Sequence, residues 1–162
     1  MTAQIHEELI CDGQATTMAF CPSLPLGHPR LVTADLDEAR RGPSDAMLFS
    51  TACWRGYVGT WEIRDGRFYL VALRGRYRLT PGGPLWADWF TGVIRIPRGE
   101  LLQYVHMGFG SVYEQELHIK VEHGVVVASR WIDNRGTAHD PWELGRRNLP
   151  GGENAFPGDD VL

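Results

Sequence analysis

The chain has 162 residues, of which 43% are hydrophobic and 22% charged. This composition is enough to bury one hydrophobic core, and it excludes a disordered chain or a coiled coil. The formal net charge of −4 and the scattered arginines and lysines argue against a nucleic-acid partner, because such domains carry a concentrated basic face.

Three cysteines, Cys11, Cys21 and Cys53, are too few and too widely spaced for a disulfide framework or a cysteine zinc site. The N-terminus lacks the basic and apolar regions of a secretory signal, and no apolar run approaches the ~20 residues of a membrane-spanning helix. We therefore expect a cytoplasmic protein with no membrane contact, no cofactor and no metal ion. Nothing in the composition divides the chain, so a single domain over residues 1–162 is predicted.

The first predicted elements are a hairpin and a short helix. Strands over Glu7–Cys11 and Gln14–Phe20 are joined by Asp12-Gly13, a pair that readily takes the positive φ angles of a type I′ turn. Between residues 33 and 41, Asp35 is placed to cap a short helix that Gly42-Pro43 would end.

Strands dominate after Phe49. Residues 55–64 alternate, with Tyr57, Gly59, Trp61 and Ile63 on one face, and Asp65-Gly66 predicts a hairpin into a strand over 67–73. Further strands are predicted over 86–96, 101–107, 112–122 and 125–132, with a turn at Pro97-Arg98-Gly99 and another at His123-Gly124.

A second helix is predicted to begin at Asp140-Pro141, and residues 150–162 form a Gly/Pro-rich, acidic, extended tail. The expected fold is mainly β, with about eight antiparallel strands and one or two short helices. The strand spacing fits a curled sheet, a sandwich or a small barrel.

The clearest strand, residues 112–122, carries a polar stripe on one face: Glu114, Glu116, His118, Lys120 and Glu122. Glu and His suit a metal site or acid–base chemistry, but alternation alone produces such a stripe on the solvated face of a half-buried strand. We favour the solvated face, and expect Glu114, Glu116 and Glu122 to contribute to association with a partner.

Aromatic residues are concentrated from Trp54 to Trp142, and three of them lie within Trp86–Phe90. On a strand, Trp86, Asp88 and Phe90 would share one face and Trp89 would lie on the other. Large aromatics on both faces indicate either a partner interface or an aromatic core. We predict an interface that includes Trp86, Asp88, Trp89 and Phe90.

Two residues are candidates for catalysis. His106 follows a predicted strand and could act as a general base with Asp88 or Glu114, or it could be a structural histidine at a hairpin corner. Cys53, next to Arg55, could be an activated nucleophile or a packed thiol. No GxSxG, HExxH or Walker pattern occurs, so we expect no enzymatic activity.

Two resemblances bear on function. Gly59-Thr60-Trp61 resembles the Gly-x-Trp signature of lipocalins, which are eight-stranded barrels for small apolar ligands, but it covers three residues and lies well inside the chain. Three longer segments, residues 51–57, 88–92 and 104–111, resemble a family of small bacterial proteins. Such families are similar in size and setting to immunity proteins of polymorphic toxins, including type VI secretion effectors.

The second resemblance implies an immunity-type protein that binds a cognate toxin and occludes its active site. The acidic balance of the chain favours a toxin with a basic cleft. Two alternatives remain open: a β-barrel that binds a small molecule, and a hydrolase that uses His106 and nearby carboxylates.

Overall fold

The computed structural model describes residues 3–35, 37, 46–106 and 109–136. These residues form one short 3-10 helix, η1 (Ala46–Phe49), and ten strands. The strands are β1 (Glu7–Cys11), β2 (Gln14–Met18), β3 (Leu31–Thr33), β4 (Tyr57–Arg64), β5 (Arg67–Gly75), β6 (Tyr77–Leu79), β7 (Leu85–Trp86), β8 (Gly92–Gln103), β9 (Val112–Glu122) and β10 (Val125–Asp133). The fold is therefore mainly β, as the alternation predicts.

The main sheet has the strand order β2-β1-β4-β5-β10-β9-β8, with β7 paired to β5, while β3 and β6 form a separate two-stranded sheet. The prediction of purely antiparallel pairing is wrong at one place, because β1 runs parallel to β4. Parallel neighbours need a long connection. Residues 12–56 provide it, and they include β2, β3 and η1.

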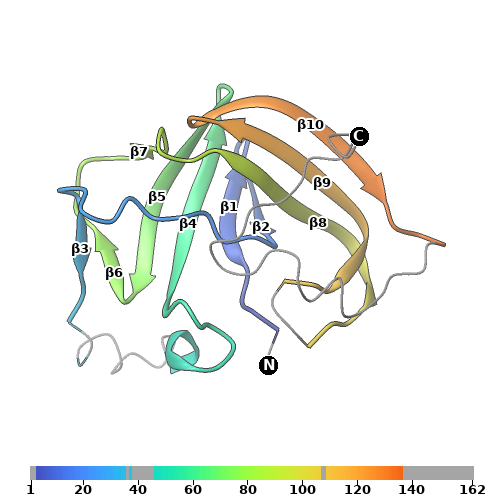
Figure 1. Cartoon of the computed structure of the whole chain (residues 1–162), viewed down its shortest axis with the longest axis horizontal. Helices are drawn as coiled ribbons and strands as arrows, with labels where there is room; N and C mark the ends of the chain where they lie inside the picture. Colours follow the sequence, from blue (N-terminus) through green and yellow to red (C-terminus); the bar gives the residue numbers. More distant parts are fainter. Residues whose placement is uncertain (1–2, 36, 38–45, 107–108, 137–162) are drawn as a thin grey trace, which may run out of the picture.

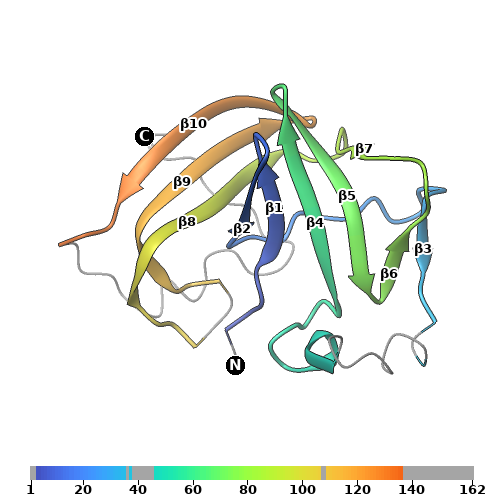
Figure 2. The same ribbon diagram turned by 180° about the vertical axis from the view of Figure 1, so that it is seen from behind.

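The sheet curls strongly without closing into a barrel (Figures 1 and 2). Its edge strands β2 and β8 approach each other, and the Ala19 N–H donates to the Arg95 carbonyl at 2.8 Å. Between β5 and β10 the pairing is limited to Arg67 and Val125. Beyond that pair β10 is no longer paired with β5. Tyr69 and Leu70 of β5 pair with β7 instead.

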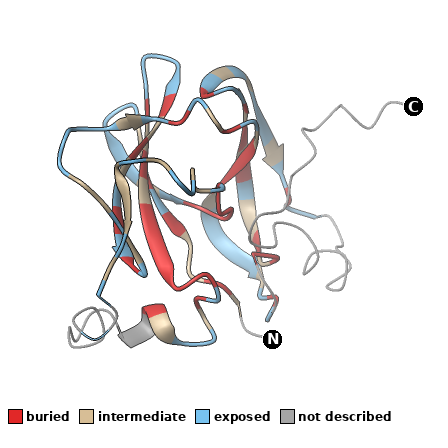
Figure 3. Cartoon of the chain, turned by 60° about the vertical axis from the view of Figure 1, so that its left-hand side comes forward, coloured by how far each residue is buried: buried red, intermediate tan, exposed pale blue. Residues whose placement is uncertain are grey.

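The strand segments that face the interior of the curl are largely buried (Figure 3). Aromatic and aliphatic side chains form this core. The rings of Trp61 and Phe68 stack with centroids 5.0 Å apart, and Phe90 lies 5.4 Å from Phe68. Ile94 on β8 and Ile119 on β9 face them. The predicted inner face of β4 is confirmed, since all four of its residues are buried: Tyr57, Gly59, Trp61 and Ile63.

The Asp-Gly hairpins are confirmed. Both central residues of each turn have positive φ, 48° and 84° at Asp12-Gly13 and 52° and 73° at Asp65-Gly66, which is the type I′ signature. The predicted turn at His123-Gly124 has the same pattern, with φ of 46° and 75°.

The predicted strand over residues 86–96 is confirmed at Trp86 and over residues 92–96 but is wrong over residues 87–91. β7 ends at Trp86, a turn follows in which the Phe90 N–H donates to the Ala87 carbonyl at 3.0 Å, and β8 begins only at Gly92. The Phe90 carbonyl accepts from the Gly124 N–H at 2.9 Å, so the β9–β10 turn satisfies the loop backbone in place of a neighbouring strand.

The predicted turn at Pro97-Arg98-Gly99 is also not a connection between two strands. β8 continues through it to Gln103, and the register with β9 shifts between Arg98 and Leu101, as at a β-bulge. Gly99 has a φ of 80°, which bends the strand without ending it.

Most residues of the two predicted helices lie outside the described residues. The Asp35 carboxylate accepts a hydrogen bond from the Asp37 N–H at 2.9 Å, as a helix cap does, but β3 still includes Thr33. Residues 36 and 38–45, the helix predicted at Asp140 and the tail over 150–162 are not described. No helix in the described part of the chain is long and apolar enough to span a membrane.

Candidate functional site

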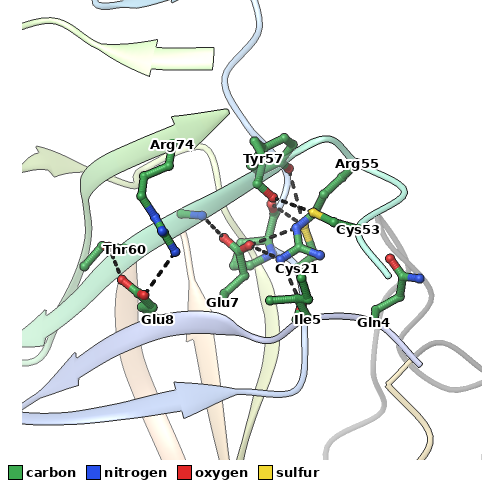
Figure 4. Close-up of polar contacts among 12 residues, drawn as sticks. Gln4, Ile5, Glu7, Glu8, Cys21, Cys53, Arg55, Tyr57, Thr60 and Arg74 are labelled. Carbon is green, nitrogen blue, oxygen red and sulfur yellow. Dashed lines mark hydrogen bonds and ion pairs between the residues drawn. The ribbon is translucent and has the colours of Figure 1, made fainter. Parts of the chain in front are cut away.

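A buried carboxylate with four hydrogen bonds, that of Glu7, lies at the start of β1 (Figure 4). One carboxylate oxygen accepts from Arg55 Nε at 2.9 Å and Nη2 at 2.5 Å. The other accepts from the Gly59 N–H and from Trp61 Nε1, both at 2.8 Å. Burial raises the pKa of Glu7, and the Arg55 charge and these donors oppose that rise. All four partners are donors, so the geometry is that of a carboxylate.

Arg55 connects this carboxylate to two further segments. Its Nη2 also donates to the Ile5 carbonyl at 2.9 Å. Its guanidinium lies 5.7 Å from the ring of Tyr57 and 5.8 Å from that of Phe109, within the range of cation–π attraction. The pair therefore ties β1, β4 and the β8–β9 connection together, and the filled Glu7 oxygens leave no acceptor for a substrate.

Two thiols lie beside the pair, and neither is suited to act as a nucleophile. Cys21 Sγ is 3.3 Å from the Tyr57 hydroxyl, and burial together with the Glu7 charge raises the pKa of Cys21 to about 12. The pKa of Tyr57 is raised too, chiefly by burial. Cys53 is buried and donates to the Tyr57 carbonyl at 3.3 Å, which matches a packed thiol.

The predicted solvated stripe on β9 is wrong at its centre. Glu116 and His118 are only 1% and 7% exposed, and Glu116 Oε2 lies 3.0 Å from His118 Nε2. β8 places Arg95 opposite His118, with Nη2 3.7 Å from Glu116 Oε1 and 2.7 Å from the Phe109 carbonyl. The Glu116 charge is thus balanced inside the protein and is not presented to a partner.

The other two acidic residues of the stripe are far apart. Glu114 lies against Gly99 at the bulge of β8, and exposed Glu122 lies at the opposite end of β9. Eight residues along a strand correspond to about 26 Å. The three glutamates do not form one acidic patch.

The predicted aromatic interface divides into core and surface. Phe90 is 4% exposed and packs against Phe20 and Phe68. Trp89 is partly buried, and its indole N–H donates to the Ser23 carbonyl at 2.8 Å. Trp86 and Asp88 are exposed. The shared strand face predicted for Trp86, Asp88 and Phe90 does not exist, because residues 87–91 form a loop.

Three of the residues predicted for the partner interface lie where the β4–β5 and β9–β10 turns meet: Trp86, Asp88 and Glu122. The Gly66 carbonyl accepts from the Val126 N–H at 2.8 Å, and the Gly124 carbonyl accepts from the Phe68 N–H at 2.9 Å. Trp86 Nε1 also donates to the Gly124 carbonyl, at 3.0 Å. These bonds hold two rigid turns and the 87–91 loop side by side.

We define the corner surface as six of the exposed residues at this junction: Asp65, Arg67, Trp86, Asp88, Glu122 and Val125. Arg64 and His123 are also exposed there. The Arg67 guanidinium lies 4.8 Å from the centre of the Trp86 ring, and Arg67 pairs with Val125 across the strands. The His123 N–H donates to Thr91 Oγ1 at 3.0 Å, which fixes the turn that follows Glu122. The same junction thus exposes a tryptophan, an arginine and three carboxylates.

His106 is not paired with the carboxylates predicted for it. Its Nδ1 lies 2.7 Å from the hydroxyl of Tyr104, and both side chains are exposed. Within residues 3–35, 37, 46–106 and 109–136, no three His, Cys, Asp or Glu side chains are grouped to hold a metal ion.

Sequence reasoning missed the Glu7–Arg55 pair, although one signal was available. A glycine inside a strand often marks a close approach to another group. A Cβ at Gly59 would lie 2.5 Å from Glu7 Oε2 and 2.6 Å from Trp61 Nε1. Gly59 and Trp61 therefore serve a buried carboxylate on the neighbouring strand.

No family model, no curated protein sequence and no solved structure matches this chain, so its function has to be argued from its own residues.

Proposed function

We propose that this chain is a cytoplasmic immunity-type protein that binds a cognate bacterial toxin and occludes its active site, with the corner surface entering a basic cleft of the toxin. The observation that carries the proposal is the exposed Trp86–Arg67 contact at a junction that also exposes Asp65, Asp88 and Glu122. In this proposal the chain itself catalyses no reaction.

The chemistry of the corner surface suits a blocking interface. Tryptophan and arginine are the residues most often found as energetic anchors of protein complexes. Carboxylates around them attract a basic cleft and accelerate association. Glu114 and Glu116 have no part in this interface, because one lies at the far end of β9 and the other is buried.

The backbone of the corner surface is tied by hydrogen bonds before binding. Both turns have type I′ geometry, and backbone hydrogen bonds of 2.8 and 2.9 Å join them. Little conformational entropy is then lost when a partner docks.

The test begins with a toxin domain encoded beside this gene, expressed with and without this chain. Co-expression should restore growth, and deletion of this gene should make cells sensitive. Cells that stay fully resistant after deletion would overturn the immunity function.

The position of the interface is tested with purified proteins. Asp88→Lys with Glu122→Lys should slow association with the toxin by about tenfold or more and reduce its salt dependence, because steering charges act mainly on the association rate. Glu100→Lys on β8, also an exposed carboxylate, is the matched control and should bind as the wild type does. Equal association rates for both variants would place the interface elsewhere.

A further inference from the structure

An open cavity of about 350 Å³ lies between η1, the loop that precedes β4 and the start of β6. Its lining includes Phe49, Cys53, Trp54, Gly56 and Arg76. The corner surface lies at the other end of β4 and β5 (Figure 1), so the two regions are separate. The volume is within the range of small-molecule sites, which begins near 300 Å³.

Close packing against Gly56 and Gly75 positions Arg76 at the cavity. The Arg76 N–H donates to the Gly56 carbonyl at 2.8 Å, and a Cβ at Gly75 would collide with that same carbonyl. At Gly56 a Cβ would lie 3.2 Å from Arg76 Nε, so the guanidinium packs directly on the glycine backbone. Gly56 and Gly75 both have positive φ, 72° and 97°, which other residues rarely adopt.

The Arg76 side chain is exposed, and among the described residues no carboxylate lies within ion-pair distance of its guanidinium. The other arginines near the interior, Arg55 and Arg95, are each paired with a buried glutamate. Within residues 3–35, 37, 46–106 and 109–136, Arg76 therefore presents to the cavity a positive charge with no ion-pair partner.

Trp54 supplies a flat apolar surface on the same cavity. Its side chain is 41% exposed, so part of the indole ring is accessible to a ligand. Its backbone is held in place, since the Trp54 N–H donates to Gln4 Oε1 at 2.8 Å. An indole face can stack on a planar ring, and a guanidinium binds a carboxylate or a phosphate through two parallel hydrogen bonds.

We propose that this cavity is a binding site for a small organic anion with a planar ring, whose carboxylate or phosphate pairs with Arg76 while its ring packs on Trp54. The site is independent of the proposed immunity function, because it shares no residue with the corner surface. Binding here is reversible and needs no chemical step.

Phenyl phosphate and benzoate are suitable probes, titrated into the intact chain to about 10 mM, the weak end of the affinity range. The indole N–H signal of Trp54, assigned by its loss in Trp54→Leu, should shift with saturation. Arg76→Gln should weaken binding by about tenfold or more, since a charged hydrogen-bond partner is lost. Arg78→Gln, an exposed arginine two residues further on β6, is the matched control and should bind within about twofold of wild type.

A titration with inorganic phosphate distinguishes a site for a ring-bearing anion from a site that binds any small anion. Inorganic phosphate should bind about tenfold more weakly than phenyl phosphate, because it has no ring to place on Trp54. The proposal is overturned if neither probe gives a saturable shift, if Arg76→Gln binds as wild type does, or if inorganic phosphate binds equally well. Unchanged circular dichroism spectra of the variants show that a loss of binding is not a loss of fold.

Discussion

The carboxylate of Glu7 and the guanidinium of Arg55 meet at 2.5 Å in the interior, with 0% and 4% of their side chains exposed. They are 48 residues apart in the chain, and the contact joins the first strand to the segment that leads into β4. A buried pair of this kind is costly to break from one side, because the remaining charge stays out of water.

Glu7→Gln should therefore lower the free energy of unfolding by about 3–5 kcal/mol, measured by urea denaturation. The neighbouring Glu8 is the matched control: it is exposed and lies 3.3 Å from Arg74. Glu8→Gln should cost less than about 1 kcal/mol, as exposed ion pairs do. Similar small losses for both variants would contradict the structural role of Glu7.

Gly59→Ala should destabilise the protein by about 1–3 kcal/mol, because its Cβ would overlap both Glu7 Oε2 and Trp61 Nε1. The test is whether the substitution lowers or raises the free energy of unfolding. Replacing glycine by alanine where the backbone and the space allow it usually stabilises by about 0.4–1 kcal/mol. A more stable Gly59→Ala variant would show that the carboxylate does not approach this glycine.

Stability should fall as the pH is lowered from about 6.5 towards 4, in part because of His6. Burial first, and then the charges of Arg95 and Arg55, lower the pKa of His6 to about 4. In the unfolded chain histidine takes up its proton near pH 6.5, so over this interval the unfolded state binds more protons and is favoured. Because one pKa unit corresponds to about 1.4 kcal/mol, the shift of the His6 pKa lowers stability by about 3 kcal/mol between pH 6.5 and pH 4.

The variant His6→Gln should show a shallower decline of the melting temperature over this interval. His106→Gln serves as the control, since His106 is exposed, and it should keep the wild-type decline. Identical pH profiles for His6→Gln and the wild type would assign the decline to other groups.

All three cysteines should be reduced and should react with a thiol reagent after denaturation without reductant. The described structure has Cys11, Cys21 and Cys53 as free thiols, two of them buried. In the native protein at pH 8 labelling should be slow, because burial raises the pKa of Cys21 to about 12 and, together with Asp12, that of Cys11 as well. Recovery of a single free thiol after denaturation would indicate a disulfide.

Local features of the fold were predictable from the sequence. The Asp-Gly turns and the bounds of β9 follow from positive-φ preferences and from alternation with a period of two, which depend only on residues next to one another in the chain. The parallel pairing of β1 with β4 was not predictable in this way, because it depends on how a connection of more than 40 residues is routed.

The proposed binding surface shows the same division. The sequence by itself determined that Trp86, Asp88 and Glu122 are polar or aromatic residues near turns, and it determined the polar alternation of β9. Only the tertiary structure decided which of these side chains reach solvent. Glu116 is buried because β8 places Arg95 beside it, and Phe90 is buried because residues 87–91 leave the strand and turn towards Phe68. Whether a charged or aromatic side chain is buried depends on partners brought from distant parts of the chain, and a pattern of neighbouring residues holds no information about them.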